Sequence, residues 1–460
     1  MLPLLLLALT ARADSETLLG PDGPSWKAFS GRGYLEVRGS WTDADGTHWQ
    51  LSERLRPSGS VAVSDRLSLH GTVEASVLQG RHAPDEARAV LEQGVIDGSG
   101  FDSLDRALEV VGCTLDTERR YDSVGDVVTL DRLHADLNLP AVDLRLGRQA
   151  VSWGSARVFN PTDVFAEYIL AEPWRERAGV DALRALVPIG ERASITAVGG
   201  FDDLPLEIRQ ARDEALPDEW QALAWKGGLR GTLLTGPVDV SMLAFHHRSG
   251  QLHRDLVGLD LRGDTELGWW VEAAWDGSLS TTDASFKGDP KLAVGVDYSF
   301  DLLQSLYVSA QLIYDGSGAS PAAMDHLARS SSNLSYGLDC GDGEPPSLLP
   351  LPDPGIVTPI DPYRATFGRA YALLIARQTV TNEWTVDLTT LVNLEDGTGL
   401  IFPSTTVNVG GHLALSGGVQ VLAGKDGEFQ PPEEALIDGS FDYNPLVPRW
   451  TALTWARFSF

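Results

Sequence analysis

Residues Leu67–Val77, with the sequence LSLHGTVEASV, alternate between apolar or small side chains and polar side chains. Leucine, glycine, valine and alanine hold the odd-numbered positions, and serine, histidine, threonine and glutamate hold the even-numbered ones. Because successive side chains of a strand point to opposite faces, the stretch predicts a β-strand with one apolar and one polar face. The alternation returns over residues 132–146 and 306–314, with Ile313 as the exception, and is noisier over 180–187 and 238–247.

The amino-terminal sequence MLPLLLLALTARA contains an apolar run followed by small residues at Ala11 and Ala13. This spacing predicts a signal peptide over residues 1–13 that is removed on export, although a short buried segment would also fit. No other stretch approaches the roughly 18 apolar residues of a membrane helix. An exported chain of alternating strands is either a soluble all-β protein, which buries its apolar faces, or a barrel that turns them toward lipid.

The spacing of the strands and links favours the barrel. The segments predict about 18 antiparallel strands of roughly 10 residues, with 16 as the alternative. Short links near residues 57–64, 140, 188–190, 234–237, 263–266, 301–304, 379–382 and 410–411 alternate with mostly longer ones, as in bacterial outer-membrane barrels. We therefore expect an all-β fold with a single transmembrane antiparallel β-barrel and both termini in the periplasm. The expected organisation is a periplasmic segment over 14–31 and a barrel over 32–460, with long extracellular loops at 79–126, 151–177, 202–219, 316–365 and 425–446.

The carboxyl terminus supports the same fold. The chain ends TALTWARFSF, which resembles the signal read by the outer-membrane assembly machinery, with Phe460 as its last residue. The expected partners are this machinery, outer-membrane lipid and lipopolysaccharide. Aromatic residues near predicted strand ends suit the interfacial girdles of such barrels: Trp41, Trp49, Trp269, Trp270, Trp275, Tyr298, Tyr314 and Trp384.

Charge and cysteine content limit the other possibilities. The formal net charge is -28, which makes nucleic acid a poor partner. Acidic residues cluster in the predicted loops, so a mouth that attracts cations is expected. The only cysteines, Cys113 and Cys340, fall in different predicted external loops and could form a disulfide in an oxidising compartment or remain thiols.

The stretch Leu144–Phe165, LRLGRQAVSWGSARVFNPTDVF, leaves a predicted strand and enters a loop. It resembles the Gly-Arg-Gln, Trp-Gly and Asn-Pro-x-Asp signature of poorly characterised porin-like outer-membrane barrels, through Gly147, Arg148, Gln149, Trp153, Gly154, Asn160, Pro161 and Asp163. The residues predict a turn at Asn160 and a possible pin between Arg148 and Asp163. Either residues 151–177 fold into the lumen as a constriction, or the motif is a latch at the barrel rim. The constriction candidates are Arg148, Gln149, Trp153, Arg157, Asn160, Asp163 and Arg175, with Glu167, Glu176 and Arg177 also near the path.

The polar faces of the predicted strands carry charges of both signs. The pore-lining candidates are Glu36, Arg38, Arg54, His70, Glu74, Arg132, His134, Asp136, Asp143, Arg145, Asp260, Arg262, Glu272 and Asp297. Such a mixed wall suits a transverse field across water, and it equally suits ion pairs between neighbouring strands.

No catalytic signature, metal motif or cofactor motif is evident in the sequence. His246, His247 and His253 surround a predicted hairpin without further ligands and are weak support for a metal site. We expect a porin-like channel for small hydrophilic solutes and no enzyme activity. The alternative is a barrel for polysaccharide export or surface attachment, which would work with periplasmic export proteins.

Overall fold

In the computed structural model, the described residues are 28–43, 47–81, 114–115, 127–165, 176–177, 179–201, 225–249, 252–279, 286–318, 338–339, 368–424, 429 and 450–460. Strands account for most of them. No helix among the described residues is long and apolar enough to cross a membrane.

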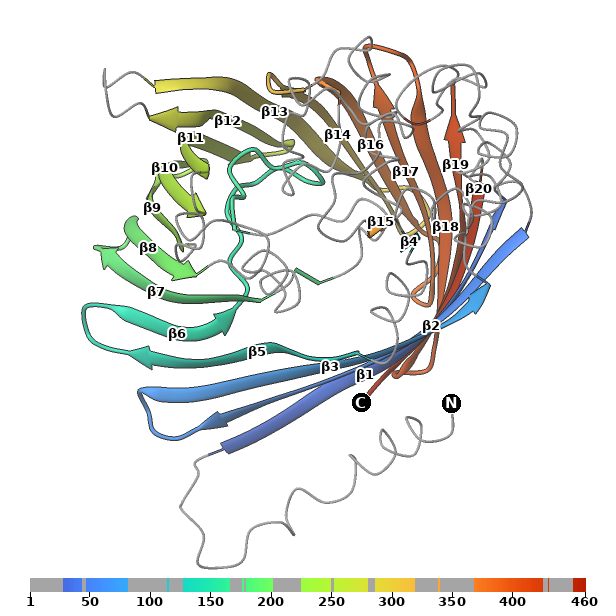
Figure 1. Ribbon diagram of the computed structural model, residues 1–460, viewed down its shortest axis with the longest axis horizontal. Helices are drawn as coiled ribbons and strands as arrows, with labels where there is room; N and C mark the ends of the chain where they lie inside the picture. Colours follow the sequence, from blue (N-terminus) through green and yellow to red (C-terminus); the bar gives the residue numbers. More distant parts are fainter. Residues whose placement is uncertain are drawn as a thin grey trace, which may run out of the picture.

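The strands form a closed, 18-stranded antiparallel ring (Figure 1). Each strand of the ring pairs with the next along the chain, and β1 closes it by pairing with β20. The ring strands are β1 (Ala28–Asp43), β2 (Thr47–Ala62), β3 (Leu67–Arg81), β5 (Val127–Asn138), β6 (Asp143–Gln149), β7 (Val180–Ile189), β8 (Ala193–Phe201), β9 (Trp225–Leu234), β10 (Val238–Ser249), β11 (Leu252–Asp264), β12 (Gly268–Leu279), β13 (Phe286–Phe300), β14 (Ser305–Asp315), β16 (Ala370–Thr379), β17 (Trp384–Asn393), β18 (Gly399–Val409), β19 (Leu413–Ala423) and β20 (Trp450–Ser459). The predicted all-β antiparallel barrel and its predicted 18 strands are confirmed, and the periplasmic location of the termini stays a prediction.

The turns alternate as the sequence predicts. Short turns join β2 to β3, β5 to β6 and every second pair of strands after that, all at one rim. The start of β1 and the end of β20 lie at this rim, because Ala28 is opposite Ala62 and the Ser459 N–H donates to the His412 carbonyl in a short turn. One boundary was wrong: the expected link over 57–64 is the end of β2, and the turn is 63–66. Pro57, which has no backbone N–H to donate, is tolerated in β2 because Gly33 lies opposite it and forms its backbone hydrogen bonds with Phe460.

The carboxyl terminus completes the ring. The Gly33 N–H donates to the Phe460 carbonyl, and the Phe460 N–H donates to the Gly33 carbonyl, each at 2.9 Å. The Phe460 ring packs against Leu35 and Leu55. A side chain at Gly33 would collide with that ring, so glycine is required for this close approach.

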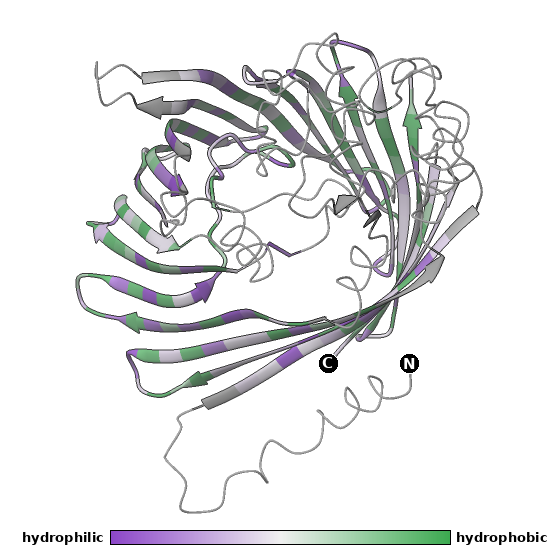
Figure 2. Ribbon diagram, viewed as in Figure 1, coloured by the Kyte–Doolittle hydropathy of each residue, from purple (hydrophilic) through white to green (hydrophobic). Residues whose placement is uncertain are grey.

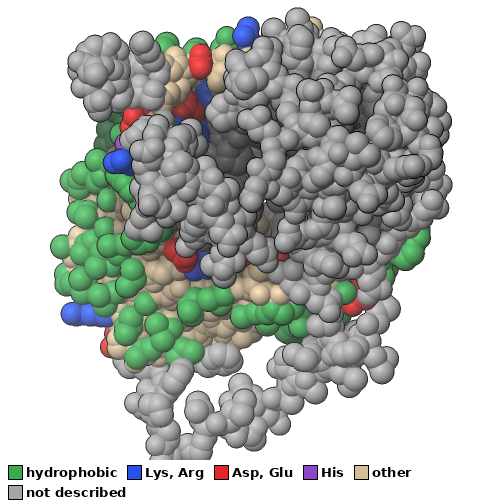
Figure 3. Space-filling view, viewed as in Figure 1, with side chains coloured by type: hydrophobic (Ala, Val, Ile, Leu, Met, Phe, Trp, Pro, Cys, Tyr) green, Lys and Arg blue, Asp and Glu red, His purple; other side chains and the backbone are tan. Residues whose placement is uncertain are grey.

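The two faces of the wall differ in chemistry. Hydrophobic and hydrophilic residues alternate along the strands (Figure 2), and hydrophobic side chains cover the outer edge that is visible in Figure 3. On β3, Val73 is 39% exposed on the outer face whereas Glu74 is 7% exposed on the inner face. Exposed aromatic residues on the outer face include Trp41, Trp49 and Tyr298. The expected alternation of an apolar exterior and a polar interior is therefore present.

A second sheet joins two loops. It consists of β4 (Thr114–Leu115) and β15 (Leu338–Asp339), in which Thr114 lies opposite Asp339. Cys113 and Cys340, the possible disulfide partners, lie outside the described residues, as do the expected signal peptide and most of the expected long loops.

Candidate functional site: the inner wall and the lumen loop

The strand register determines which side chains face the inside of the barrel. Glu74 faces inward, and two residues that lie opposite each other on neighbouring strands point to the same side of the wall. The inner face can therefore be followed from strand to strand around the whole ring. It places every pore-lining candidate on the inner face: Glu36, Arg38, Arg54, His70, Glu74, Arg132, His134, Asp136, Asp143, Arg145, Asp260, Arg262, Glu272 and Asp297.

Two assignments from the sequence were wrong. Arg148 lies on the outer face, because β6 continues to Gln149 and the alternation that turns Arg145 inward turns Arg148 outward. There it forms an ion pair with Asp181 at 3.1 Å instead of the expected pin to Asp163. Trp270 was expected in an interfacial girdle, but it faces inward and is 3% exposed. Its indole N–H donates to the Gln311 carboxamide oxygen at 2.9 Å.

A bulge adds a charge to the inner wall that the sequence pattern concealed. The register between β3 and β5 shifts between Thr72 and Val73, so that Asp131 is an extra residue on β5. A bulge leaves one residue unpaired and changes the direction of its side chain. Asp131 consequently joins Arg132 inside the barrel, and it forms ion pairs with both Arg132 and Arg56.

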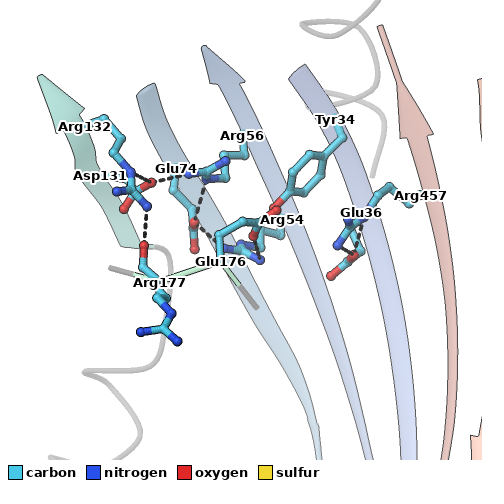
Figure 4. A network of polar contacts seen from close by, with 10 residues as sticks. All are labelled: Tyr34, Glu36, Arg54, Arg56, Glu74, Asp131, Arg132, Glu176, Arg177 and Arg457. Carbon is cyan, nitrogen blue, oxygen red and sulfur yellow. Dashed lines mark hydrogen bonds and ion pairs between the residues drawn. The ribbon is translucent and has the colours of Figure 1, made fainter. Parts of the chain in front are cut away.

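The strands around Asp131 carry a band of arginines, which we call the arginine wall: Arg54, Arg56, Arg132 and Arg457 (Figure 4). Each of these residues has a carboxylate partner. Arg54 contacts Glu74 at 2.6 Å, and Arg457 contacts Glu36 at 2.6 Å. The Arg457 guanidinium also lies 4.4 Å from the centre of the Tyr34 ring. These side chains therefore face inward and pair with one another, and the transverse field expected from the sequence stays a prediction.

Between β6 and β7 the chain leaves the wall and runs inside the ring (Figure 1). We call residues 150–165 the lumen loop. Its shape depends on Asn160, whose side-chain NH2 donates to the Trp153 carbonyl at 2.7 Å and whose oxygen accepts from the Thr162 N–H at 3.2 Å. Gly154 has φ +86, and a side chain there would collide with the Asn160 carboxamide. Asp163 accepts a hydrogen bond from the Trp153 N–H at 3.2 Å. The Trp-Gly and Asn-Pro-x-Asp elements thus form one folded unit.

A buried carboxylate fixes the lumen loop to the wall. Glu272 on β12 is 0% exposed. It accepts hydrogen bonds from the backbone N–H groups of Ser155 and Ala156, from the Thr162 N–H at 3.3 Å and from the Thr162 hydroxyl at 2.8 Å. The Ser155 hydroxyl donates to Asp260 on β11 at 2.6 Å. Two pore-lining candidates therefore hold the loop in place and are covered by it.

Apolar side chains on the inner wall lie beneath the lumen loop. Trp153 and Phe165 pack with inward-facing residues of β7 to β12, including Phe245. Val158 and Phe159 pack on a second group, which contains Ile313 and Tyr371. Ile313, the exception in the alternating pattern, is therefore apolar because the loop covers it. The noisy segments 180–187 and 238–247 belong to the same covered area.

Arg157 projects from the lumen loop and stays partly exposed. Its guanidinium contacts Asp297, and the Arg157 side chain is 41% exposed. It also donates to the Tyr307 hydroxyl at 2.9 Å and lies 5.1 Å from the centre of the Trp270 ring. Tyr307 donates to the same Asp297 carboxylate at 2.9 Å. This arrangement holds a positive charge at a defined place in the lumen.

The return of the loop contacts the arginine wall. Glu176 forms an ion pair with Arg54 at 3.2 Å and accepts from the Tyr34 hydroxyl at 2.9 Å. Burial raises the pKa of Glu176, but hydrogen bonds and the charges of Arg54 and Arg56 outweigh burial, and the pKa falls below its ordinary value. The Arg177 side chain pairs with Asp163, and its carbonyl accepts from Arg132. Arg177 therefore takes the place that the sequence predicted for Arg148.

The remaining constriction candidates have separate positions. Gln149 is buried, and its side chain donates to the Ala182 carbonyl at 2.8 Å, so it anchors the start of the loop. Arg175 and Glu167 lie outside the described residues.

No family model matches the chain, and no curated protein matches its sequence. Solved structures do match. OccK5 (OpdH) of Pseudomonas aeruginosa aligns with a TM-score of 0.50 and 9% identity over 94% of this chain and 98% of that one. OccAB4 of Acinetobacter baumannii aligns with a TM-score of 0.47 and 7% identity over 95% of this chain and 100% of that one. A mutant porin of Rh. blastica aligns with a TM-score of 0.41 and 10% identity over 94% of this chain and 100% of that one. The likeness to OccK5 concerns the fold alone, which is a porin-like barrel.

Proposed function

We propose that this chain is a channel for small hydrophilic solutes in the outer membrane of a Gram-negative bacterium. The observation that carries the proposal is the contrast between the two faces of a closed barrel. Exposed apolar side chains such as Leu133 and Leu312 cover the outside, and paired charges such as Arg54 and Glu74 line the inside. A closed ring leaves no unpaired strand edge in lipid, and its polar inner face suits water.

The lumen loop supplies the constriction in this proposal. It is held to one side of the barrel by Glu272, and it presents Arg157 toward the lumen. The arginine wall contributes further charges from β2, β5 and β20, and its acidic partners lie on β1, β3 and β5. A passing solute would meet fixed charges of both signs, which favours polar over apolar cargo.

Planar-bilayer recording tests the proposal. We expect the purified barrel to give steady, ohmic conductance. Arg157→Gln removes an exposed positive charge from the lumen loop, so the reversal potential in a salt gradient should shift toward greater cation preference. Arg148→Gln is the matched control, because it removes the same charge from the outer face and should leave conductance and selectivity unchanged.

The result also separates the channel from the export alternative. An inserted barrel that carries no current would contradict the channel and would favour a plugged barrel for polysaccharide export. Equal shifts from Arg157→Gln and Arg148→Gln would show that the lumen loop does not line the path.

A further inference from the structure

Two histidines and one aspartate converge on the inner wall, away from the lumen loop. His70 on β3 lies directly opposite His134 on β5, and Asp136 follows His134 on the same face. The histidine rings are stacked, with their centres 4.9 Å apart. The group lies near the rim of the short turns, since β3 begins at Leu67 and β5 ends at Asn138.

The ligand atoms are close enough to share one cation. The Asp136 Oδ2 atom lies 3.2 Å from His70 Nε2 and 3.9 Å from His134 Nε2. One potential ligand atom from each residue falls within 4.8 Å of the others. Zinc bonds of about 2.0–2.2 Å in tetrahedral geometry put neighbouring ligand atoms about 3.4 Å apart. Small rotations of the two histidine rings would therefore let both rings and the Asp136 carboxylate coordinate one metal ion, with water as the fourth ligand.

The surrounding contacts suit metal ligands. His134 Nδ1 lies 3.3 Å from the Arg148 carbonyl, a bond that would place the proton on Nδ1 and leave the Nε2 lone pair facing Asp136. Arg145 donates to the Asp136 Oδ1 atom at 2.5 Å, which orients the carboxylate. The His70 side chain is 36% exposed, so water in the lumen reaches the group.

A neighbouring arginine, Arg145, lowers the expected affinity for a cation without removing the site. Arg145 also contacts the Asp136 Oδ2 atom at 3.1 Å and must yield part of that contact to a cation. Its positive charge repels a cation, whereas the ring nitrogens bind divalent metals by coordination rather than by charge alone. This ligand set favours a transition metal over Ca²⁺ or Mg²⁺, which prefer oxygen ligands.

We propose that His70, His134 and Asp136 bind a divalent first-row transition cation, such as Zn²⁺, on the inner wall near the short-turn rim. An occupied site would add positive charge to the wall at this depth. In a channel, it would reduce the passage of cations while the metal stays bound.

Metal binding by the purified full-length barrel in detergent provides the test, with Zn²⁺ in equilibrium dialysis and Co²⁺ as a spectroscopic probe. We expect one saturable site and, with Co²⁺, visible absorption bands typical of four or five ligands. His70→Gln, His134→Gln and Asp136→Asn should each weaken binding by at least about tenfold, because even the loss of an outer-shell partner costs that much. These measurements do not depend on conduction, so a failure here leaves the proposed channel untouched.

His246→Gln is the matched control. His246 also bonds to an aspartate, Asp255, at 2.6 Å, but the pair lies on the outer face beside Trp225. This variant should bind Zn²⁺ as the parent does. The proposal is overturned if the parent has no saturable Zn²⁺ site, or if the three site variants bind as tightly as His246→Gln does. Circular dichroism and heat-modifiable migration of each variant would show that the barrel is intact.

Discussion

Replacing Glu272 with alanine removes the carboxylate on which the lumen loop is seated. The side chain is 0% exposed and accepts hydrogen bonds from Ser155, Ala156 and Thr162. The alanine variant leaves the backbone N–H groups of Ser155 and Ala156 without their acceptor, whereas the Thr162 N–H keeps the Asn160 side-chain oxygen. Each buried donor that loses its partner costs about 1–3 kcal/mol. At the lower end of that range, the docked loop is destabilised by roughly 2 kcal/mol relative to an undocked one.

This free energy predicts a visible change in gating. About 1.4 kcal/mol corresponds to a tenfold change in an equilibrium constant, so the ratio of docked to undocked loop should fall roughly thirtyfold. Single-channel recording of Glu272→Ala should then show a higher mean conductance or additional open levels. Glu272→Gln retains one acceptor oxygen and should lie between the parent and the alanine variant.

Asp181→Ala is the control, because it also removes an acidic side chain but from the outer face, where Asp181 pairs with Arg148. It should conduct as the parent does. If Glu272→Ala inserts normally and its conductance and noise match those of Asp181→Ala, then this carboxylate does not hold the loop in the lumen.

Three further predictions follow from other contacts. Gly154→Ala should loosen the lumen loop and raise the noise of the channel current. A residue with a side chain pays about 1–2 kcal/mol for a left-handed backbone, and the new methyl group would collide with the Asn160 carboxamide. Recordings that match those of the parent would contradict this prediction. Cys113 and Cys340 should form a disulfide, because each adjoins a residue of the β4 and β15 pair in register, and peptide mass spectrometry without reduction should find the linked peptides rather than two free thiols. Deleting Phe460 removes two backbone hydrogen bonds that close the ring, so less folded barrel should reach the outer membrane, as measured by heat-modifiable migration of membrane fractions; equal amounts would show that closure does not need it.

The fold could be predicted because its main determinant is local. The alternation over Leu67–Val77 follows from the apolar surroundings outside the wall and the polar surroundings inside it, and every strand of a closed barrel has these same two sides. The inner-face assignment of residues such as Glu36, Asp260 and Asp297 follows from the same period of two. The turn phase required only the positions of short links, which are visible in sequence.

The site was harder to predict because it depends on contacts across the barrel. The bulge that brings Asp131 inside is a register shift, which the alternation on either side does not mark. Arg148 was misplaced because β6 is longer than the pattern suggested, and the partner of Asp163 is Arg177, on the far limb of the loop. His70 and His134 meet only through strand pairing, and no local spacing indicates that they do.

The apolar patch under the lumen loop also bears on the course of the channel. Leu243, Phe245 and Leu256 face the inside and are at most 5% exposed, although the barrel interior suits polar side chains. Without the loop they would meet water, at a cost of about 25 cal/mol for each Å² uncovered. The sequences of the wall and the loop therefore match: beneath the loop the wall is mostly apolar, apart from the carboxylates Glu272 and Asp260 that bind the loop, whereas the arginine wall is charged. Water and solutes should consequently pass between Arg157 and the arginine wall, so selectivity should respond to Arg54 and not to the covered apolar residues.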